Sequence, residues 1–354
     1  MTAKIKGVFE KKNVIVTGGA GFIGSHICEE LLKKGEAQVI CLDNFVSGQE
    51  INIDPLLQWP DFKFIKHDII EPIDLIKFPE LVAFNLEFQG IQEIYNCASP
   101  TSYKDPKKLP LQTALTNSAG LKNVLDLAKT YQAPLVHLSS SVVYGDPLPE
   151  TKYFSEDYWG FVNPLGDRAS YNESKRFAET LCSIYREQEG VDAKVARIFS
   201  TYGPRMKMAE GRMIPDFIGN ALDNKDIVIY GDEATKSSYC YVKDTVDALF
   251  KLMASADAGP LNIGNSEEYK ISEIADKIIK ILNSKSKIVY EKPLASFQVQ
   301  GLPDIKKAKE RISWFPLTPL DQGLEATIRF IESARFHYEQ KGLWQMDEPE
   351  GNGG

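Results

Sequence analysis

The sequence predicts an α/β protein built on a doubly wound parallel sheet, with a smaller C-terminal α/β lobe. Short apolar, β-branched segments alternate with amphipathic helical segments through the first 200 residues. This is the pattern of parallel strands joined by crossover helices. A glycine-rich turn follows the first segment, and beyond residue 200 the alternation becomes irregular. We therefore assign 1–200 to a cofactor-binding domain, 201–345 mainly to a substrate-binding lobe and 346–354 to a disordered tail.

The elements follow from periodicity and from glycine and proline breaks. For the first domain we expect strands at 13–17, 38–42, 62–66, 92–96, 135–138 and 195–199, and helices at 25–34, 111–130 and 171–189. For the second region we expect helices at 213–222, 244–253 and 271–282, and short strands at 227–232, 239–242 and 261–264.

The composition is that of a soluble globular protein, with 43% apolar and 25% charged residues among 354. The net charge is −8 without a basic block, which argues against nucleic acid or an anionic membrane as a partner. The five cysteines are scattered and none of the four histidines has zinc-site spacing. We see no signal peptide and no apolar run of about 18 residues. We therefore expect a cytoplasmic protein without a bound metal.

The glycine-rich turn (TGGAGFIG) is the clearest binding motif, because it lies between the first predicted strand and the first predicted helix. Gly18 permits a tight turn, Gly21 lets a pyrophosphate approach the backbone, and Gly24 lets helix and strand pack closely. The free N–H groups at the start of the helix, around Phe22 and Ile23, can bind phosphate. The motif predicts a Rossmann-type dinucleotide-binding domain.

Residues after the next strands complete the predicted cofactor site. Asp43 lies about 20 residues beyond the glycines, where a carboxylate can bind a ribose 2′-hydroxyl and repel a 2′-phosphate. No arginine is close to Asp43 or Asn44, so we expect NAD rather than NADP. Asp68 and Ile69 are placed to meet the adenine, although an ordinary loop acid is an equally good interpretation of Asp68. Ala98 is small enough to let the cofactor pass near the backbone.

Three residues are candidates for catalysis. Ser140 ends a strand, at the sheet edge where ligands gather in open α/β folds. Tyr171 and Lys175 are one turn apart on one face of a predicted helix. The Lys⁺ favours the phenolate form of the tyrosine, which can take a proton from a sugar hydroxyl while a hydride leaves the same carbon. Many helices carry such a pair by chance, so this interpretation depends on the glycine motif and on Ser140.

With these residues in view, the chain resembles the extended short-chain dehydrogenase/reductase family that modifies nucleotide sugars, and within it the UDP-glucuronate decarboxylases. The resemblance covers about 14–329. The family's YxxxK pattern matches Tyr171 and Lys175, and its Ser/Thr matches Ser140. The shared segments are 17–24 (TGGAGFIG), 67–72 (HDIIEP), 144–147 (YGDP), 157–166 (DYWGFVNPLG), 197–206 (RIFSTYGPRM), 259–265 (GPLNIGN) and 303–309 (PDIKKAK).

The resemblance implies a reaction that begins at C4 of a sugar. NAD⁺ takes the C4 hydride while Tyr171 takes the hydroxyl proton, and Lys175 also bonds the nicotinamide ribose. The ketone then permits loss of CO₂, loss of water or epimerisation, and NADH returns the hydride. The resemblance also implies a homodimer through a four-helix bundle formed by 111–130 and 171–189. The alternatives are an oxidase that releases the 4-keto sugar and a non-catalytic NAD-binding paralogue.

Several positions depart from the decarboxylase pattern. Val142 stands where decarboxylases and dehydratases carry a Glu, which leaves the outcome open between decarboxylation and 4-epimerisation. Ser200, Ser237 and Gly301 replace an Asn and two Arg that serve the substrate in the family, and neither Ser nor Gly offers the bidentate grip of Arg. The predicted contacts to a nucleoside-diphosphate sugar are Ser141, Ser200, Arg205, Arg212, Tyr230 and Lys236.

Overall fold

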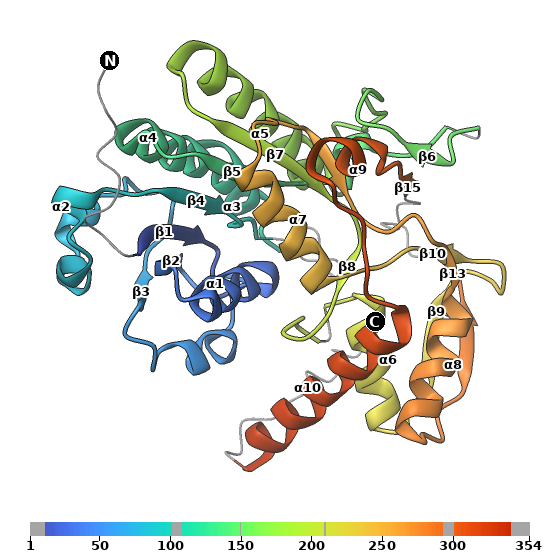
Figure 1. Ribbon diagram of the computed structural model, residues 1–354. Coiled ribbons are helices and arrows are strands. Elements are labelled where there is room, and N and C mark those ends of the chain that lie inside the picture. The colour runs from blue at the N-terminus through green and yellow to red at the C-terminus, as the bar shows by residue number, and fades with distance from the viewer. Residues whose placement is uncertain (1–10, 101–107, 149, 209, 293–300, 341–354) are drawn as a thin grey trace.

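Seven parallel strands form the centre of the structure, a computed structural model that describes residues 11–100, 108–148, 150–208, 210–292 and 301–340. The strands are β1 (Lys12–Thr17), β2 (Ala37–Asp43), β3 (Phe62–Lys66), β4 (Glu93–Asn96), β5 (Leu135–Ser140), β7 (Ala193–Ile198) and β12 (Leu261–Ile263). Their order is β12-β7-β5-β4-β1-β2-β3 (Figure 1). The order reverses between β1 and β4, and a ligand crevice is expected at that point in a doubly wound sheet.

Helices cover both faces of this sheet (Figure 1). One face carries α1 (Phe22–Lys34) and α7 (Val242–Ala254), and the other carries α3 (Pro110–Leu115), α4 (Leu121–Tyr131) and α5 (Ala169–Glu189). Alternate strand residues point to opposite faces. Val14 and Val16 accordingly join the core under α1, and Ile15 joins the core under α4. Because both faces are covered, the strands are apolar along nearly their whole length.

The lobe packs its helices around a small pair of parallel strands. Its main elements are α6 (Met213–Leu222), β9 (Ile227–Tyr230), α8 (Ile271–Leu282), β14 (Ile288–Glu291) and α10 (Leu320–Gln340). β9 pairs with β14, and α10 lies against α6 and α8. The apolar side chains of the lobe, among them Phe217 and Ile274, belong to the same core cluster as those under α1. The lobe therefore shares one core with the sheet.

Short elements complete the chain: α2 (Leu86–Gln89), β6 (Tyr153–Phe154), β8 (Thr201–Tyr202), β10 (Lys236–Ser237), β11 (Cys240–Tyr241), β13 (Tyr269–Lys270), β15 (Leu302–Pro303) and α9 (Lys306–Ile312). The six strands predicted for the first domain all occur, with ends that differ by about one or two residues. The region 201–345 is more mixed than predicted. β12 pairs with β7, with Leu261 opposite Ala196, and α7 packs on the sheet. The predicted tail, 346–354, lies outside the described residues.

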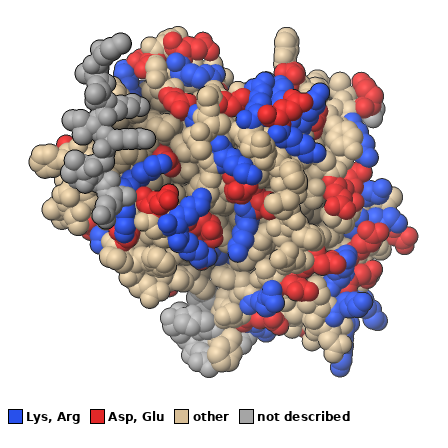
Figure 2. Space-filling view, viewed as in Figure 1, with Lys and Arg blue, Asp and Glu red and all other residues tan. Residues whose placement is uncertain are grey.

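Charged side chains of both signs are interspersed over the face shown in Figure 2. Among the described residues, no helix combines the length and the apolar character needed to cross a bilayer. The same residues contain no group of three or more His, Cys, Asp or Glu side chains that could hold a metal ion.

Candidate functional site

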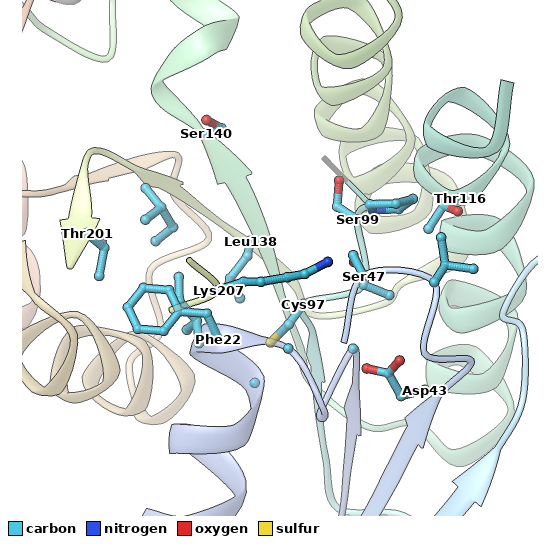
Figure 3. A pocket seen from close by; sticks show the side chains of 18 of the residues that line it. Phe22, Asp43, Ser47, Cys97, Ser99, Thr116, Leu138, Ser140, Thr201 and Lys207 are labelled. Carbon is cyan, nitrogen blue, oxygen red and sulfur yellow. The ribbon is translucent and has the colours of Figure 1, made fainter. Parts of the chain in front are cut away.

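A cleft opens at the carboxyl ends of the parallel strands (Figure 3). It is an open cleft with an empty volume of about 1470 Å³. The fold brings together there every residue that the sequence predicted for catalysis or for the cofactor: Gly18, Gly21, Phe22, Ile23, Gly24, Asp43, Asn44, Asp68, Ile69, Ala98, Ser140, Tyr171 and Lys175.

The glycine turn is shaped for a close backbone approach. Gly18 has φ +66°, a conformation that glycine adopts without strain, and a Cβ there would lie 2.7 Å from the backbone of Ala98. A Cβ on Gly24 would collide with the carbonyl oxygen of Gly18. The first turn of α1 carries neither a side-chain cap nor an acid, so its N–H groups and the helix dipole favour an anion. These residues therefore fit a dinucleotide diphosphate.

Asp43 holds the glycine turn in place and also lines the cleft. Its Oδ2 accepts a hydrogen bond from the N–H of Ala20 (3.0 Å), and its Oδ1 accepts one from the N–H of Phe45 (2.8 Å). Burial raises the pKa of this carboxyl, and the bonds from Phe45 and Ala20 oppose that shift. The carboxylate thus organises the backbone around the predicted ribose position.

Asp68 is positioned by three donors. Its Oδ2 accepts hydrogen bonds from Asn44 Nδ2 (2.9 Å) and Gln112 Nε2 (2.9 Å), and its Oδ1 accepts one from the N–H of Ile70 (3.0 Å). The neighbouring Ile69 is buried. Asn44, a predicted cofactor contact, therefore also supports the predicted adenine contact.

Lys175 is buried beside Tyr171 under the cleft. Its Nζ donates a hydrogen bond to the carbonyl oxygen of Leu138 (2.7 Å) and lies 6.0 Å from the centre of the Tyr171 ring. Burial lowers the pKa of Lys175 to about 8, against the opposing effects of Cys97 and Glu179. The ammonium can therefore supply both a donor and a positive field next to the phenol.

Ser140 lies at the end of the cleft opposite Asp43 (Figure 3). Its Oγ accepts a weak hydrogen bond from the N–H of Val142 (3.4 Å) and caps the 3₁₀ turn Ser141–Tyr144. Val142 is buried in this turn. Among the described residues that line the cleft, the only carboxylates are those of Asp43, Asp68 and Glu210.

The predicted substrate contacts divide into two groups. Ser141, Ser200, Arg205 and Arg212 line the cleft, whereas Tyr230 and Lys236 do not. Tyr230 ends β9 and Lys236 begins β10, in the small sheets of the lobe. Their part in substrate binding stays a prediction.

Arg205 is engaged by α1, although it lines the cleft. Its Nη2 pairs with Glu29 Oε2 (2.7 Å) and its Nη1 donates to the carbonyl oxygen of Ser25 (3.1 Å). The carbonyl oxygen of Pro204 lies 3.0 Å from His26 Nε2. This side chain therefore anchors the chain after β8 to the helix of the glycine turn.

Sequence reasoning missed several residues of the cleft. Ser47, Gln49 and Asn52 come from the segment after β2. The N–H of Gln49 and Nδ2 of Asn52 both donate to the carbonyl oxygen of Ala20 (3.0 and 2.9 Å). A polar stretch after a strand end was the available signal for them. Thr116 begins the π-helical turn between α3 and α4, which periodicity could not indicate.

A partly buried polar network supports α5, the helix that carries Tyr171 and Lys175. The carboxylate of Glu179, one turn after Lys175, accepts a hydrogen bond from Ser139 Oγ (2.6 Å) and pairs with Arg197 Nη2 (2.7 Å). Arg197 Nη1 donates to the hydroxyl of Tyr144 (2.9 Å), which donates to Asn262 Oδ1 (2.6 Å). The network connects α5 to β5, β7 and β12.

Comparison with known proteins places this geometry in a family. Residues 14–264 match the NAD dependent epimerase/dehydratase family. The chain is 39% identical over 328 residues to UDP-glucuronic acid decarboxylase 1 of Danio rerio, covering 93% of this chain and 74% of that protein. It is also 39% identical over 311 residues to UDP-glucuronic acid decarboxylase 5 of Arabidopsis thaliana, covering 88% and 86%.

Solved structures of similar enzymes share this fold. UDP-glucuronic acid 4-epimerase from Bacillus cereus, in complex with UDP-glucuronic acid and NAD, superposes with a TM-score of 0.77 at 26% identity, covering 91% of this chain and 99% of that chain. dTDP-glucose 4,6-dehydratase from Bacillus anthracis, in complex with NAD, gives 0.76 at 26% identity, covering 93% and 99%. The predicted fold, cofactor and family are thus confirmed. The chain belongs to the NAD dependent epimerase/dehydratase family, as an enzyme that modifies nucleotide sugars with NAD.

Proposed function

We propose that this enzyme oxidises C4 of UDP-glucuronic acid to the ketone and re-reduces it to the C4 epimer. The observation that carries the proposal is the position of Ser140, Tyr171 and Lys175, which all line the same cleft as the glycine turn. The turn that follows Ser140 presents Val142 and no acid. This site has the groups for a redox step at one carbon, and among the described residues the turn after Ser140 offers no acid or base to assist bond breaking at the next carbon.

The choice of substrate rests on what the similar proteins have in common. The sequence relatives are named for decarboxylation of UDP-glucuronic acid, and one structural neighbour for its 4-epimerisation. Both activities use the same nucleotide sugar. Arg212 lines the cleft and is our candidate for an anionic group of this substrate.

The side chains divide the proton chemistry between them. The phenolate of Tyr171 takes the proton of the C4 hydroxyl and later returns it. Ser140 Oγ donates a hydrogen bond to the C4 oxygen. Lys175 keeps its ammonium beside the phenol through the bond to the carbonyl oxygen of Leu138. NAD held by the glycine turn and Asp43 would supply the acceptor and donor of the C4 hydride.

Val142 favours retention of the carboxyl group. A 4-keto uronic acid is a β-keto acid, and loss of CO₂ leaves an enolate that must be protonated at C5. The buried valine cannot donate a proton. Decarboxylation is the second candidate, favoured by 39% identity over most of the chain to named decarboxylases, because a β-keto acid can lose CO₂ without acid assistance.

We also propose that two copies associate through α3 and α5, which contact each other in one subunit. Large apolar side chains remain exposed on both helices: Leu111 (70%) and Leu115 on α3, and Phe177 (49%) and Ile184 on α5. Pairing the two helices with their copies would form a four-helix bundle that buries them. Phe177→Glu is expected to convert a dimer to a monomer in light scattering after gel filtration, and an unchanged mass would reject this interface.

The products identify the reaction. UDP-glucuronic acid is incubated with the enzyme and an equal amount of NAD, and the mixture is followed by NMR, by CO₂ capture and by the absorbance of NADH. The C4 epimer without CO₂ is expected. Stoichiometric CO₂ would establish decarboxylation, and accumulating NADH with a ketone would establish an oxidase. If neither product nor NADH appears, the proposed substrate is wrong.

A further inference from the structure

The segment between β8 and α6 runs along the cleft. We call residues 203–208 and 210–212 the strap. Lys207, on this strap, lines the cleft. Figure 3 shows its side chain lying across the cleft from beside Phe22, with the ammonium directed towards Ser47 and Ser99.

The strap is fixed to α1, the helix that follows the glycine turn. Glu29 pairs with Arg205 (2.7 Å), and the carbonyl oxygen of Ser25 accepts from the same guanidinium (3.1 Å). His26 Nε2 meets the carbonyl oxygen of Pro204 (3.0 Å). Arg205 takes φ +69°, the left-handed conformation, so the chain turns there. Lys207 thus lies in the cleft two residues after Arg205, which binds the helix that follows the glycine turn.

The charge of Lys207 suits a diphosphate. The described residues that line the cleft include four Lys or Arg, namely Lys175, Arg205, Lys207 and Arg212. Lys175 is buried beside Tyr171, and Arg205 is bound to α1. Lys207 is partly exposed and pairs with Glu210 (2.7 Å). An ammonium has three donors, so it can keep the carboxylate and still bind a phosphate oxygen.

The position of Lys207 indicates which diphosphate it meets. Both NAD and a nucleotide-sugar substrate carry one. In the view of Figure 3 the Lys207 side chain appears on the side of Phe22, Cys97 and Asp43, while Ser140 is drawn at the other end. The strap that carries Lys207 is bonded to Ser25, His26 and Glu29 of α1, the helix that follows the glycine turn. The start of α1 offers only partial positive charge to two phosphates.

We propose that Lys207 binds the diphosphate of NAD from the strap side and so clasps the cofactor against the glycine turn. The strap connects β8 to α6 of the lobe, so the clasp joins the cofactor to the part of the chain that we assign to the substrate. Such a clasp suits an enzyme in which the same NAD must return its hydride.

This assignment can be tested by calorimetry, which measures the affinity of three probes for protein from which bound nucleotide has been removed. ADP-ribose carries the diphosphate without nicotinamide, adenosine carries no phosphate, and UDP represents the substrate, added in the presence of NAD. Lys207→Met is expected to lower the affinity for ADP-ribose by about ten- to a hundredfold, which is the contribution of one charge-assisted hydrogen bond. Adenosine and UDP should bind as to the wild type, and Lys207→Arg should restore ADP-ribose binding.

Two further variants sharpen the result. Lys225→Met removes another exposed lysine of the lobe, paired with Asp223 (3.3 Å) outside the cleft, and should change none of the three affinities. Glu29→Gln removes the ion pair that holds the strap and should lower the affinity for ADP-ribose severalfold. The affinity for adenosine should stay unchanged, which also shows that the fold is intact. Unaltered ADP-ribose affinity in Lys207→Met overturns the proposal. The proposal is also overturned if Lys207→Met lowers the affinity for UDP and leaves the affinity for ADP-ribose unchanged. Lys207 would then bind the substrate.

Discussion

Different kinds of contact hold the two halves of the cleft in place. The cofactor half contains the glycine turn, Asp43 and Asp68, and the other half contains Ser140 and Arg205. In the cofactor half, backbone N–H groups bond Asp43 and Asp68, two short side-chain amides add bonds to Asp68, and the glycine turn is set by backbone conformation. In the other half, long side chains do this work: Arg205 reaches α1 and Arg197 reaches α5. Backbone geometry suits any enzyme that binds the same cofactor, whereas side chains can be exchanged singly. We therefore expect the second half to decide the product of the reaction.

Replacing the phenol should break the chemistry and leave the cofactor half intact. Tyr171→Phe removes the proton acceptor, and turnover of UDP-glucuronic acid should fall by at least about a thousandfold. ADP-ribose affinity should stay within about twofold, because the glycine turn is untouched. Turnover by coupled NMR and binding by calorimetry check the two statements. Turnover within tenfold of the wild type would remove Tyr171 from the mechanism.

Breaking the partly buried ion pair between Glu179 and Arg197 tests how firmly side chains hold the second half. Glu179→Gln leaves Arg197, whose side chain is only 12% exposed, without its partner charge. The free energy of unfolding should drop by about 1–3 kcal/mol, less than the loss when one member of a fully buried pair is removed. Urea unfolding followed by circular dichroism measures it.

The matched control is an exposed pair. Lys122 bonds Asp126 (2.7 Å) one turn along α4, with both side chains about half exposed. Lys122→Met should cost about 0–1 kcal/mol, because solvent screens such pairs. Equal losses in the two variants would contradict the view that the network under the cleft holds α5 in place.

The sequence predicted the cofactor half better than the substrate half, and the reason is physical. Strand periodicity and the glycine motif act locally, so β1 to β5 and the residues at their ends were found. Nothing local marks Leu261–Ile263 as a seventh strand of the main sheet, since its partner β7 lies far away in the chain.

The contacts of long side chains were the second feature that the sequence could not predict. Arg205 was assigned to substrate on chain position, yet its guanidinium turns back to Glu29. Glu29 and Arg205 meet only because the chain after β8 crosses over α1. The pairing of Lys207 with Glu210 carries no local signal either, since a Lys and a Glu three residues apart occur in many loops. Contacts of this kind depend on the tertiary fold and cannot be predicted from sequence motifs.

Position 142 should set the partition between products. Val142→Glu places a carboxyl group in the turn after Ser140, and the ratio of CO₂ to epimer should rise by about ten- to a hundredfold, the range of one positioned acid or base. Val142→Gln has nearly the same size without the titratable group and should leave the ratio near that of the wild type. NMR of the products with CO₂ capture measures the ratio. An equal rise in both variants would show that polarity or size acts there instead of proton transfer.

The pH profile should show the buried ammonium that lies between the two halves. Burial lowers the pKa of Lys175 to about 8, so the group is charged below that pH and neutral above it. Loss of the charge weakens the phenolate of Tyr171, and kcat/KM should fall by about tenfold for each pH unit above 8. Lys175→Arg keeps its charge through this range, so a slower variant without the alkaline fall is expected. Profiles from pH 6 to 10 compare the two proteins, and a shared alkaline limb would assign the titration to a group other than Lys175.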